Sequence, residues 1–341
     1  MGKYFAFAFC LLIFNCSAQQ VVPVNKNATK EAKELLQYLY RIKDKKTLYG
    51  MHNIIGGMST STDSIYKITG SYPAIWGGDF GFADEKHDID NIKYRPLLVP
   101  EIEKQYARGS IIVLSYHQAN PFLGEPTPFE GGIISKLTDA QWKELTTPGT
   151  ALYKKWCAQM DIIAVYFKQL QAAKIPVIFR PYHEMNGGWF WWGHRKGADG
   201  FKALWNQLYN YYTIHHQLNN ILWAWTPDKP LEDVADYYPN TNTVDILGCD
   251  IYPQKNKAIV YPQEWFDRML KLANGKPLAL TEHSVLPNQE ILKNQPWAWM
   301  MSWGKMVFDQ NSREKIRDFS DFKQVIMLNK LPIKIREHKK K

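Results

Sequence analysis

Cysteine is scarce in this chain of 341 residues, which contains only four. Cys10 and Cys16 lie in the apolar N-terminal segment, so Cys157 and Cys249 are the two in the remaining sequence. These two are far apart in the sequence, unlike the closely spaced cysteines of zinc-binding or redox motifs. An oxidising compartment permits one disulfide between them, but we expect two buried thiols.

Other features are missing as well. After the N-terminal segment, no apolar run is long enough to cross a bilayer, so we expect no membrane span. No glycine-rich phosphate turn follows the first predicted strand, which argues against an open dinucleotide-binding sheet. The net charge of +9 comes partly from a basic tail over residues 335–341. Elsewhere cations and anions alternate, as in Lys30–Lys46, so we expect a solvated surface and no nucleic-acid partner.

The N-terminus has the pattern of an export signal. Lys3 precedes the apolar run Tyr4–Phe14, and small residues lead to Ala18. This pattern predicts a signal peptide over residues 1–18 and export to the periplasm or beyond. Lipid attachment at Cys16 is the alternative, although Phe14-Asn15 is a poor approach to a lipidated cysteine. We expect an N-terminal extension over 19–29 and one catalytic domain over 30–334, because nothing resembles an interdomain linker.

Aromatic residues, by contrast, are abundant. They make up 14% of the chain, with 13 Trp and 19 Tyr. Their flat apolar faces and polar edges suit sugar rings, flat ligands and unstacked bases. A large core that happens to use tryptophan gives the same composition, so composition alone does not choose between these readings.

Apolar runs bounded by turn residues predict eight strands, several of them apolar enough to be buried on both faces. The predicted strands are Leu48–Asn53, Pro73–Phe80, Ile111–His117, Pro176–His183, Ile221–Thr226, Val244–Tyr252, Pro277–Glu282 and Trp297–Trp303. Between them lie amphipathic stretches, among them Asn91–Ala107, Leu152–Ala173, Phe201–Gln217 and Trp265–Ala273. This alternation predicts an α/β fold, a (β/α)8 TIM barrel in a single domain.

Almost every predicted strand ends in polar or aromatic residues. The strand-end carboxylates are Asp79, Glu184, Asp228, Asp250 and Glu282. Barrel enzymes gather their catalytic groups at the carboxyl ends of the strands. This rim therefore favours an enzyme over a structural protein.

Two of these carboxylates suit the cleavage of a glycosidic bond, which needs a protonated acid and an ionised carboxylate. Glu184 precedes an aromatic segment, Trp189–Trp192, that could raise its pKa by desolvation. Glu282 lies between Thr281 and His283, whose donors could hold it as the anion. Salt bridges at the rim are the alternative explanation for either glutamate.

Two segments carry a resemblance to a known family. The segment Arg180–Gly193, which reads RPYHEMNGGWFWWG, resembles the acid/base strand of glycoside hydrolase family 26. Leu280–His283 resembles that family's nucleophile strand, and the resemblance extends over nearly the whole mature chain. It implies a retaining endo-β-1,4-mannanase without a cofactor. Glu282 would be the nucleophile and Glu184 the acid/base, and a covalent glycosyl-enzyme would form.

The resemblance also implies roles for five other residues. His183 would bond near the nucleophile, Tyr252 would bond the nucleophile carboxylate, and His117 would contact sugar on the donor side. Trp189 would stack at the cleavage subsite and Trp303 would form the platform beneath the sugar being cleaved. Gly304 follows Trp303, where the family often has a polar or basic residue. Trp191 and Trp192 could stack on sugar or anchor the loop, whereas we expect Trp223 and Trp225 to point into the packed layers.

Other functions remain open from the sequence. A β-glucanase or xylanase could use the same scaffold. A metal-dependent barrel hydrolase could use His52, His117, His183, Asp79 or Asp250 as ligands, although no strand carries a His-x-His pair. A sugar-binding barrel without catalysis is a further alternative. We expect no metal in the site, a β-mannan polysaccharide or oligosaccharide as partner, and a monomer.

Overall fold

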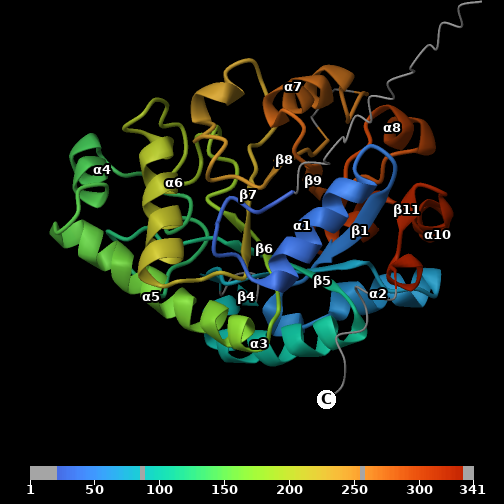
Figure 1. Ribbon diagram of the computed structural model, residues 1–341, viewed down its shortest axis with the longest axis horizontal. Coiled ribbons are helices and arrows are strands. Elements are labelled where there is room, and N and C mark those ends of the chain that lie inside the picture. The colour runs from blue at the N-terminus through green and yellow to red at the C-terminus, as the bar shows by residue number, and fades with distance from the viewer. Residues whose placement is uncertain (1–20, 85–88, 254–257, 333–341) are drawn as a thin grey trace, which may run out of the picture.

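The protein is a closed barrel of parallel strands surrounded by helices (Figure 1). The computed structural model describes residues 21–84, 89–253 and 258–332. The predicted signal peptide and the basic tail lie outside these residues. The barrel strands are β1 (Thr47–His52), β2 (Ile75–Asp79), β5 (Ile111–Tyr116), β6 (Val177–Pro181), β7 (Ile221–Trp225), β8 (Ile246–Asp250), β9 (Leu278–His283) and β10 (Trp299–Ser302).

The eight barrel strands are the eight predicted from the sequence, most of them one to four residues shorter than predicted. They pair in chain order, and the barrel closes where β1 pairs with β10 in parallel register. Short additions flank this barrel: β11 (Val325–Ile326) pairs with β1, and β3 (Ala83–Asp84) pairs with β4 (Ile89–Asp90) as a separate hairpin. The predicted (β/α)8 TIM barrel is therefore confirmed.

Helices connect the strands on the outside of the barrel. They are α1 (Lys30–Ile42), α2 (Thr60–Thr69), α3 (Asn91–Arg108), α4 (Asp139–Leu145), α5 (Ala151–Ala172), α6 (Phe201–Asn210), α7 (Gln263–Ala273), α8 (Gln289–Asn294), α9 (Met306–Gln310) and α10 (Arg313–Asp321). Short 3-10 turns occur at η1 (Ile55–Gly57), η4 (Val234–Tyr237) and η5 (Leu328–Lys330). The helix predicted over Phe201–Gln217 is not one α-helix, because it changes at Tyr211 into a π-helical turn, η3 (Tyr211–His215). None of the helices in the described part of the chain is long and apolar enough to cross a membrane.

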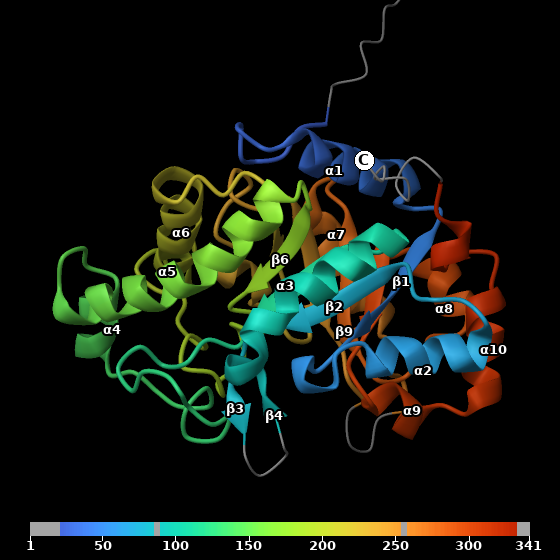
Figure 2. The same ribbon diagram turned by 90° about the horizontal axis from the view of Figure 1, so that it is seen from below.

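Alternate residues of each strand face opposite sides, which builds two separate apolar clusters. Inward-facing residues such as Leu48, Ile75 and Ile178 pack with the apolar face of α1. In Figure 2, α1 covers one end of the barrel, while the β3–β4 hairpin and α9 lie toward the opposite end. The α1 helix therefore closes the end of the barrel where the strands begin. A functional site is expected at the opposite end, where the strands finish.

Outward-facing residues pack under the surrounding helices. Trp223 and Trp225 are buried in this outer cluster, as predicted. Cys249 is buried on β8, whereas Cys157 on α5 is only half-buried, and both thiols are free. The expectation of two buried thiols is therefore correct for Cys249 and wrong for Cys157, which lies partly on the outer face of its helix.

Candidate active site

The inner face of the barrel changes from apolar to polar at the carboxyl ends of its strands. On β6, Arg180 follows the inward-facing Ile178 by two positions, and on β8, Asp250 follows Ile246 by four. An even spacing along a strand keeps side chains on one face. The same alternation turns His52 and Asp79 inward at the ends of β1 and β2. The strands therefore deliver a layer of charged and polar groups above the apolar interior.

Glu282 reaches this layer because β9 contains a β-bulge. Cys249 pairs with Leu280 and Asp250 pairs with Glu282, so one additional residue, Thr281, lies opposite β8. The register on the β10 side shifts at the same place. Regular alternation from the inward-facing Ala279 would turn Glu282 toward the helices. The bulge re-aims the side chain, as bulges beside active sites commonly do.

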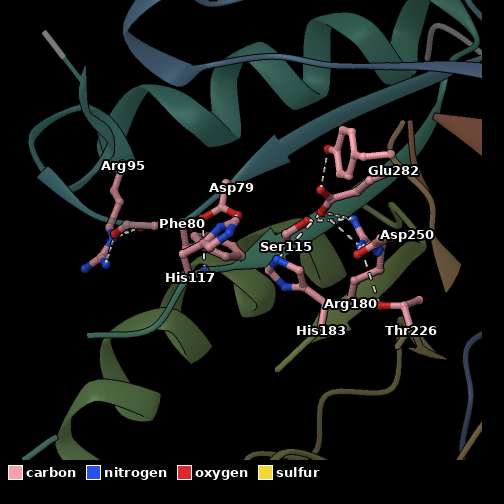
Figure 3. A network of polar contacts seen from close by, with 12 residues as sticks. Asp79, Phe80, Arg95, Ser115, His117, Arg180, His183, Thr226, Asp250 and Glu282 are labelled. Carbon is pink, nitrogen blue, oxygen red and sulfur yellow. Dashed lines mark hydrogen bonds and ion pairs between the residues drawn. The ribbon is translucent and has the colours of Figure 1, made fainter. Parts of the chain in front are cut away.

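The Glu282 carboxylate lies in a cage of polar groups (Figure 3). Both terminal nitrogens of Arg180 lie 3.1 Å from Oε1, and the Tyr252 hydroxyl donates a hydrogen bond of 2.8 Å to Oε2. His183 Nε2 lies 3.6 Å from Oε1. Arg180 also contacts both oxygens of Asp250, at 2.9 and 3.0 Å, and is fully buried. The cage therefore fixes the direction of the carboxylate and balances part of its charge.

The donors predicted for Glu282 from its neighbours in sequence point elsewhere. The Thr281 hydroxyl donates to Asp250 Oδ1, and His283 Nδ1 faces the carbonyl of Val285. The prediction was wrong because adjacent residues on a strand do not share a direction, and the bulge changes the direction again. Arg180 and Tyr252, from two other parts of the chain, supply the contacts instead.

Glu184 lies just beyond β6, on a backbone that leaves the extended conformation. Its φ is +54° and that of Tyr182 is +49°, values that residues other than glycine rarely adopt. The amide of Glu184 donates to the Thr226 carbonyl on the neighbouring strand end at 2.8 Å, which holds this turn in place. The half-buried side chain accepts a 2.8 Å hydrogen bond from the indole N–H of Trp189.

The surroundings of the two glutamates affect their pKa values unequally. Burial raises the pKa of Glu184 well above its usual range, and the negative charges of Asp250 and Glu282 add to this shift. Burial also raises the pKa of Glu282, but the Arg180 guanidinium and the Tyr252 hydroxyl act in the opposite direction. The pKa of Glu282 stays raised, but less than that of Glu184, so Glu184 is the more readily protonated of the two and Glu282 the more readily ionised.

The histidines of the site form one contiguous group. His117 Nδ1 lies 2.7 Å from Asp79 Oδ2, and its ring meets that of His183 edge-on, with 4.4 Å between centroids (Figure 3). Although burial alone would raise the pKa of Asp79, His117 lowers it. Burial lowers the pKa of His183 well below its usual range, so its ring is neutral at neutral pH. Asp79 therefore orients His117 and leaves the other ring nitrogen for a further partner.

Trp303 forms a wall of the site and rests on His52. Their rings are stacked with centroids 3.6 Å apart and an angle of 15° between planes. Burial lowers the pKa of His52 to about 3, and neither ring nitrogen has a hydrogen-bond partner among the described residues. Gly304 follows with a φ of +51°, a left-handed conformation that glycine adopts without a steric penalty.

Two of the aromatic residues predicted as possible sugar contacts are unavailable to a sugar. Trp191 and Trp192 are fully buried, and their indole N–H groups donate to the carbonyls of Gln118 and His183. They anchor the loop beneath the rim. Trp189 and Trp303, by contrast, are partly exposed.

The structure brings all seven site residues predicted from the sequence to one end of the barrel, and it adds three to which the sequence assigned no role in a glycosidase: Arg180, Asp250 and Asp79. Arg180 belongs to the family segment quoted above, and the sequence offers the two aspartates as strand-end carboxylates and as ligands of the alternative metal-dependent hydrolase. The signal that could have found them is their even spacing from inward-facing apolar residues.

Three of these groups have the spacing of metal ligands. One ligand atom each from His183, Asp250 and Glu282 lie within 4.8 Å of one another. The guanidinium of Arg180, however, already contacts both carboxylates. A divalent cation there would have to approach a buried positive charge, so the arrangement does not fit a resident metal.

Comparison with known proteins agrees with this geometry. The family model described as glycosyl hydrolase family 26 matches residues 24–332. A mannan endo-1,4-beta-mannosidase of Bacillus subtilis is 31% identical over 281 residues, covering 78% of this chain and 74% of that protein. An enzyme of the same name from Thermothelomyces thermophilus is 30% identical over 317 residues, covering 90% of this chain and 62% of that longer protein.

Solved structures also match this chain over most of its length. GH26A from Muricauda sp. MAR_2010_75 superimposes with a TM-score of 0.84 at 37% identity, covering 90% of this chain and 99% of that one. A beta-mannanase from a symbiotic protist of the termite Reticulitermes speratus, complexed with gluco-manno-oligosaccharide, has a TM-score of 0.78 at 28% identity, covering 91% and 97%. By its sequence, its barrel and the extent of these matches, the chain is a glycoside hydrolase that belongs to glycosyl hydrolase family 26.

Proposed function

We propose that this protein is a retaining endo-β-1,4-mannanase that cleaves mannan or galactomannan through a covalent glycosyl-enzyme. One observation carries the mechanism: two glutamates at the mouth of one barrel have opposite surroundings. Glu282 is held by a cation and a hydroxyl, whereas Glu184 lies against Trp189 and near three other carboxylates. Retaining glycosidases need one ionised and one protonated carboxyl group.

In the first step, Glu282 attacks the anomeric carbon of the bound sugar and the glycosidic C–O bond breaks. Glu184 gives its proton to the departing oxygen, so the leaving sugar departs as a neutral alcohol. In the second step, the Glu184 carboxylate takes a proton from water, and that water attacks the anomeric carbon. The bond to Glu282 breaks, which restores both glutamates and retains the anomeric configuration.

The remaining residues bind and orient. Arg180 and Tyr252 hold Glu282 in the direction of attack. Trp303, partly exposed and stacked on His52, would lie under the sugar at the cleavage point, and Trp189 would border the leaving-group side beside Glu184. His117, oriented by Asp79, and His183 complete the polar wall toward the donor side.

Mannan is the proposed substrate because both relatives compared above carry the name mannan endo-1,4-beta-mannosidase. The gluco-manno-oligosaccharide in the structure of the termite symbiont's enzyme supports the same substrate class. Mixed-linkage glucan and xylan are the alternatives on this scaffold.

We further propose that residues 1–18 direct export, that residues 30–334 form the catalytic domain, and that the protein acts as a monomer without a metal. The contact of Arg180 with both Asp250 and Glu282 supports a metal-independent reaction. Dialysis against EDTA should leave turnover unchanged, and loss of activity restored by a divalent cation would favour a metal-dependent hydrolase instead.

The decisive experiment is incubation with galactomannan, mixed-linkage glucan and xylan, followed by product sizing and early NMR of the new reducing ends. We expect mannan-derived oligosaccharides of several sizes, first released as the β-anomer. Release of the α-anomer would contradict the double displacement. Binding without turnover on all three polymers would favour a non-catalytic sugar-binding barrel.

A further inference from the structure

A second cluster of ligand-type side chains lies in the outer helical layer. Asp161 belongs to α5, and His215 and His216 lie at the end of the π-helical turn η3 that follows α6. Figure 1 shows α5 and α6 together on the outside of the barrel. None of the three residues takes part in the proposed reaction.

The three side chains converge on a small volume. One ligand atom from each of Asp161, His215 and His216 lies within 4.8 Å of the other two. His216 Nε2 lies 2.8 Å from Asp161 Oδ1, and the two imidazole centroids are 4.8 Å apart at an angle of 83°. From this geometry we propose that Asp161, His215 and His216 form a binding site for a zinc-type transition-metal ion.

The chemistry of the donors favours zinc over the hard cations. Two imidazole nitrogens and one carboxylate oxygen form a common three-residue ligand set for zinc, with water as the fourth ligand. Magnesium and calcium prefer sites built from oxygen. With Zn–ligand bonds of about 2.1 Å, tetrahedral ligand atoms lie roughly 3.4 Å apart. The distance of 2.8 Å between His216 Nε2 and Asp161 Oδ1 would have to open by ~0.6 Å to reach this spacing, a small movement for an Asp161 side chain that is half-exposed.

The π-helical turn accounts for the presence of two adjacent histidines at one site. Neighbouring residues of a regular α-helix do not face each other. Here the amide of His216 donates to the carbonyl of Tyr211, five residues earlier, at 3.0 Å. Single π-helical turns inside helices occur frequently at functional sites.

Tyr211 holds two of the proposed ligands in place. Its hydroxyl donates to Asp161 Oδ1 at 2.7 Å, and its ring stacks on His215 with centroids 4.7 Å apart and 9° between planes. Metal sites generally have such supporting groups, which orient the ligands before the ion binds. A simple His216–Asp161 hydrogen bond would need neither the stacked His215 nor this support.

The test is zinc titration of the untagged full-length protein by isothermal calorimetry, with magnesium as the negative control. We expect saturable binding of one zinc ion per chain. His215→Ala, His216→Ala and Asp161→Asn should each weaken zinc binding at least ~10-fold, and Tyr211→Phe about 10-fold. Because zinc would tie α5 to η3, zinc at 100-fold excess over its Kd should also raise Tm by ~3–6 °C.

Two matched controls distinguish this site from general binding to surface groups. His194→Asn removes an exposed histidine elsewhere and keeps a residue that tolerates its left-handed φ of +60°. Cys157→Ser changes the nearby thiol one helical turn before Asp161 on α5. Both should bind zinc like the unmodified protein.

Failure of the zinc proposal can be distinguished from failure of the proposed mannanase function, because polysaccharide turnover should be the same in every one of these variants. Equal zinc affinity in the unmodified protein and in a His215→Ala/His216→Ala double variant would overturn the site. So would the absence of saturable zinc binding in the unmodified protein. Circular dichroism without zinc verifies that each variant is folded.

Discussion

The two proposed catalytic glutamates share one chemical group but differ in how the chain holds them. Glu282 is part of a barrel strand and lies against Arg180 and Tyr252. Glu184 lies beyond the end of its strand, in a left-handed turn, with Trp189 as its hydrogen-bond partner. In the proposed reaction, their surroundings rather than their side chains distinguish the nucleophile from the group that transfers the proton.

This contrast also decides how the pH dependence should behave. The acid limb of a bell-shaped profile of kcat/KM reports the group that must be ionised, and the alkaline limb the group that must be protonated. With Glu282 as nucleophile and Glu184 as acid, anything that favours an anion at Glu282 extends activity to lower pH. A change that favours an anion at Glu184 makes activity fall at a lower pH on the alkaline side.

Removing either carboxyl group is the strongest test of the comparison. Glu282→Gln should reduce kcat by more than the ~10⁴-fold upper range for a general acid, because no covalent intermediate can form. Glu184→Gln should lower kcat/KM about 10²–10⁴-fold on mannan and far less on an aryl mannoside, whose acidic leaving group departs in the first step without a proton. Steady-state kinetics on both substrates measure this. If both variants lose activity equally on the aryl mannoside, the assigned roles are wrong.

Arg180 tests the charge balance beneath Glu282. Arg180→Met leaves two buried carboxylates, Asp250 and Glu282, without their common cation. We expect the free energy of unfolding to fall by about 3–5 kcal/mol, because a buried ion pair loses one partner. Urea denaturation measures the loss, and an additional Asp250→Asn change should recover part of it. A loss below about 1 kcal/mol would contradict the proposed balance.

Tyr252→Phe removes one donor from the Glu282 cage without changing the ring. The lost hydrogen bond is made to a charged group, so we expect transition-state stabilisation to fall by about 1.5–3 kcal/mol. The pKa of Glu282 rises, and the acid limb of kcat/KM should move to higher pH, which narrows the profile. An unchanged acid limb would show that Glu282 does not control it.

Trp189→Phe is the matched change beside Glu184, since it removes a donor at the same distance of 2.8 Å. This indole N–H lowers the pKa of Glu184, against the larger effect of burial. Without it the pKa of Glu184 rises further, so the alkaline limb should move to higher pH and the profile should widen. We expect the smallest loss of kcat/KM of the series, about tenfold or less. Narrowing would contradict the assignment of Glu184 as the acid.

Much of this protein could be predicted from local patterns. The eight strands were visible as apolar runs, and the barrel followed from their alternation with helices. The buried position of Trp223 and Trp225 also followed from their place within a strand. Thr281 and His283 failed as partners of Glu282, because contacts across a barrel are made between residues far apart in sequence.

The sequence alone determined the barrel and the rim of functional groups, and it supplied the two glutamates proposed for catalysis, since periodicity, strand ends and short motifs are local properties. Only the tertiary structure decided how those glutamates are held. A bulge at Thr281 turns Glu282 inward, and a buried arginine from β6 meets carboxylates from β8 and β9. Strand register and closure of the barrel set such contacts, and neither can be read from a stretch of neighbouring residues.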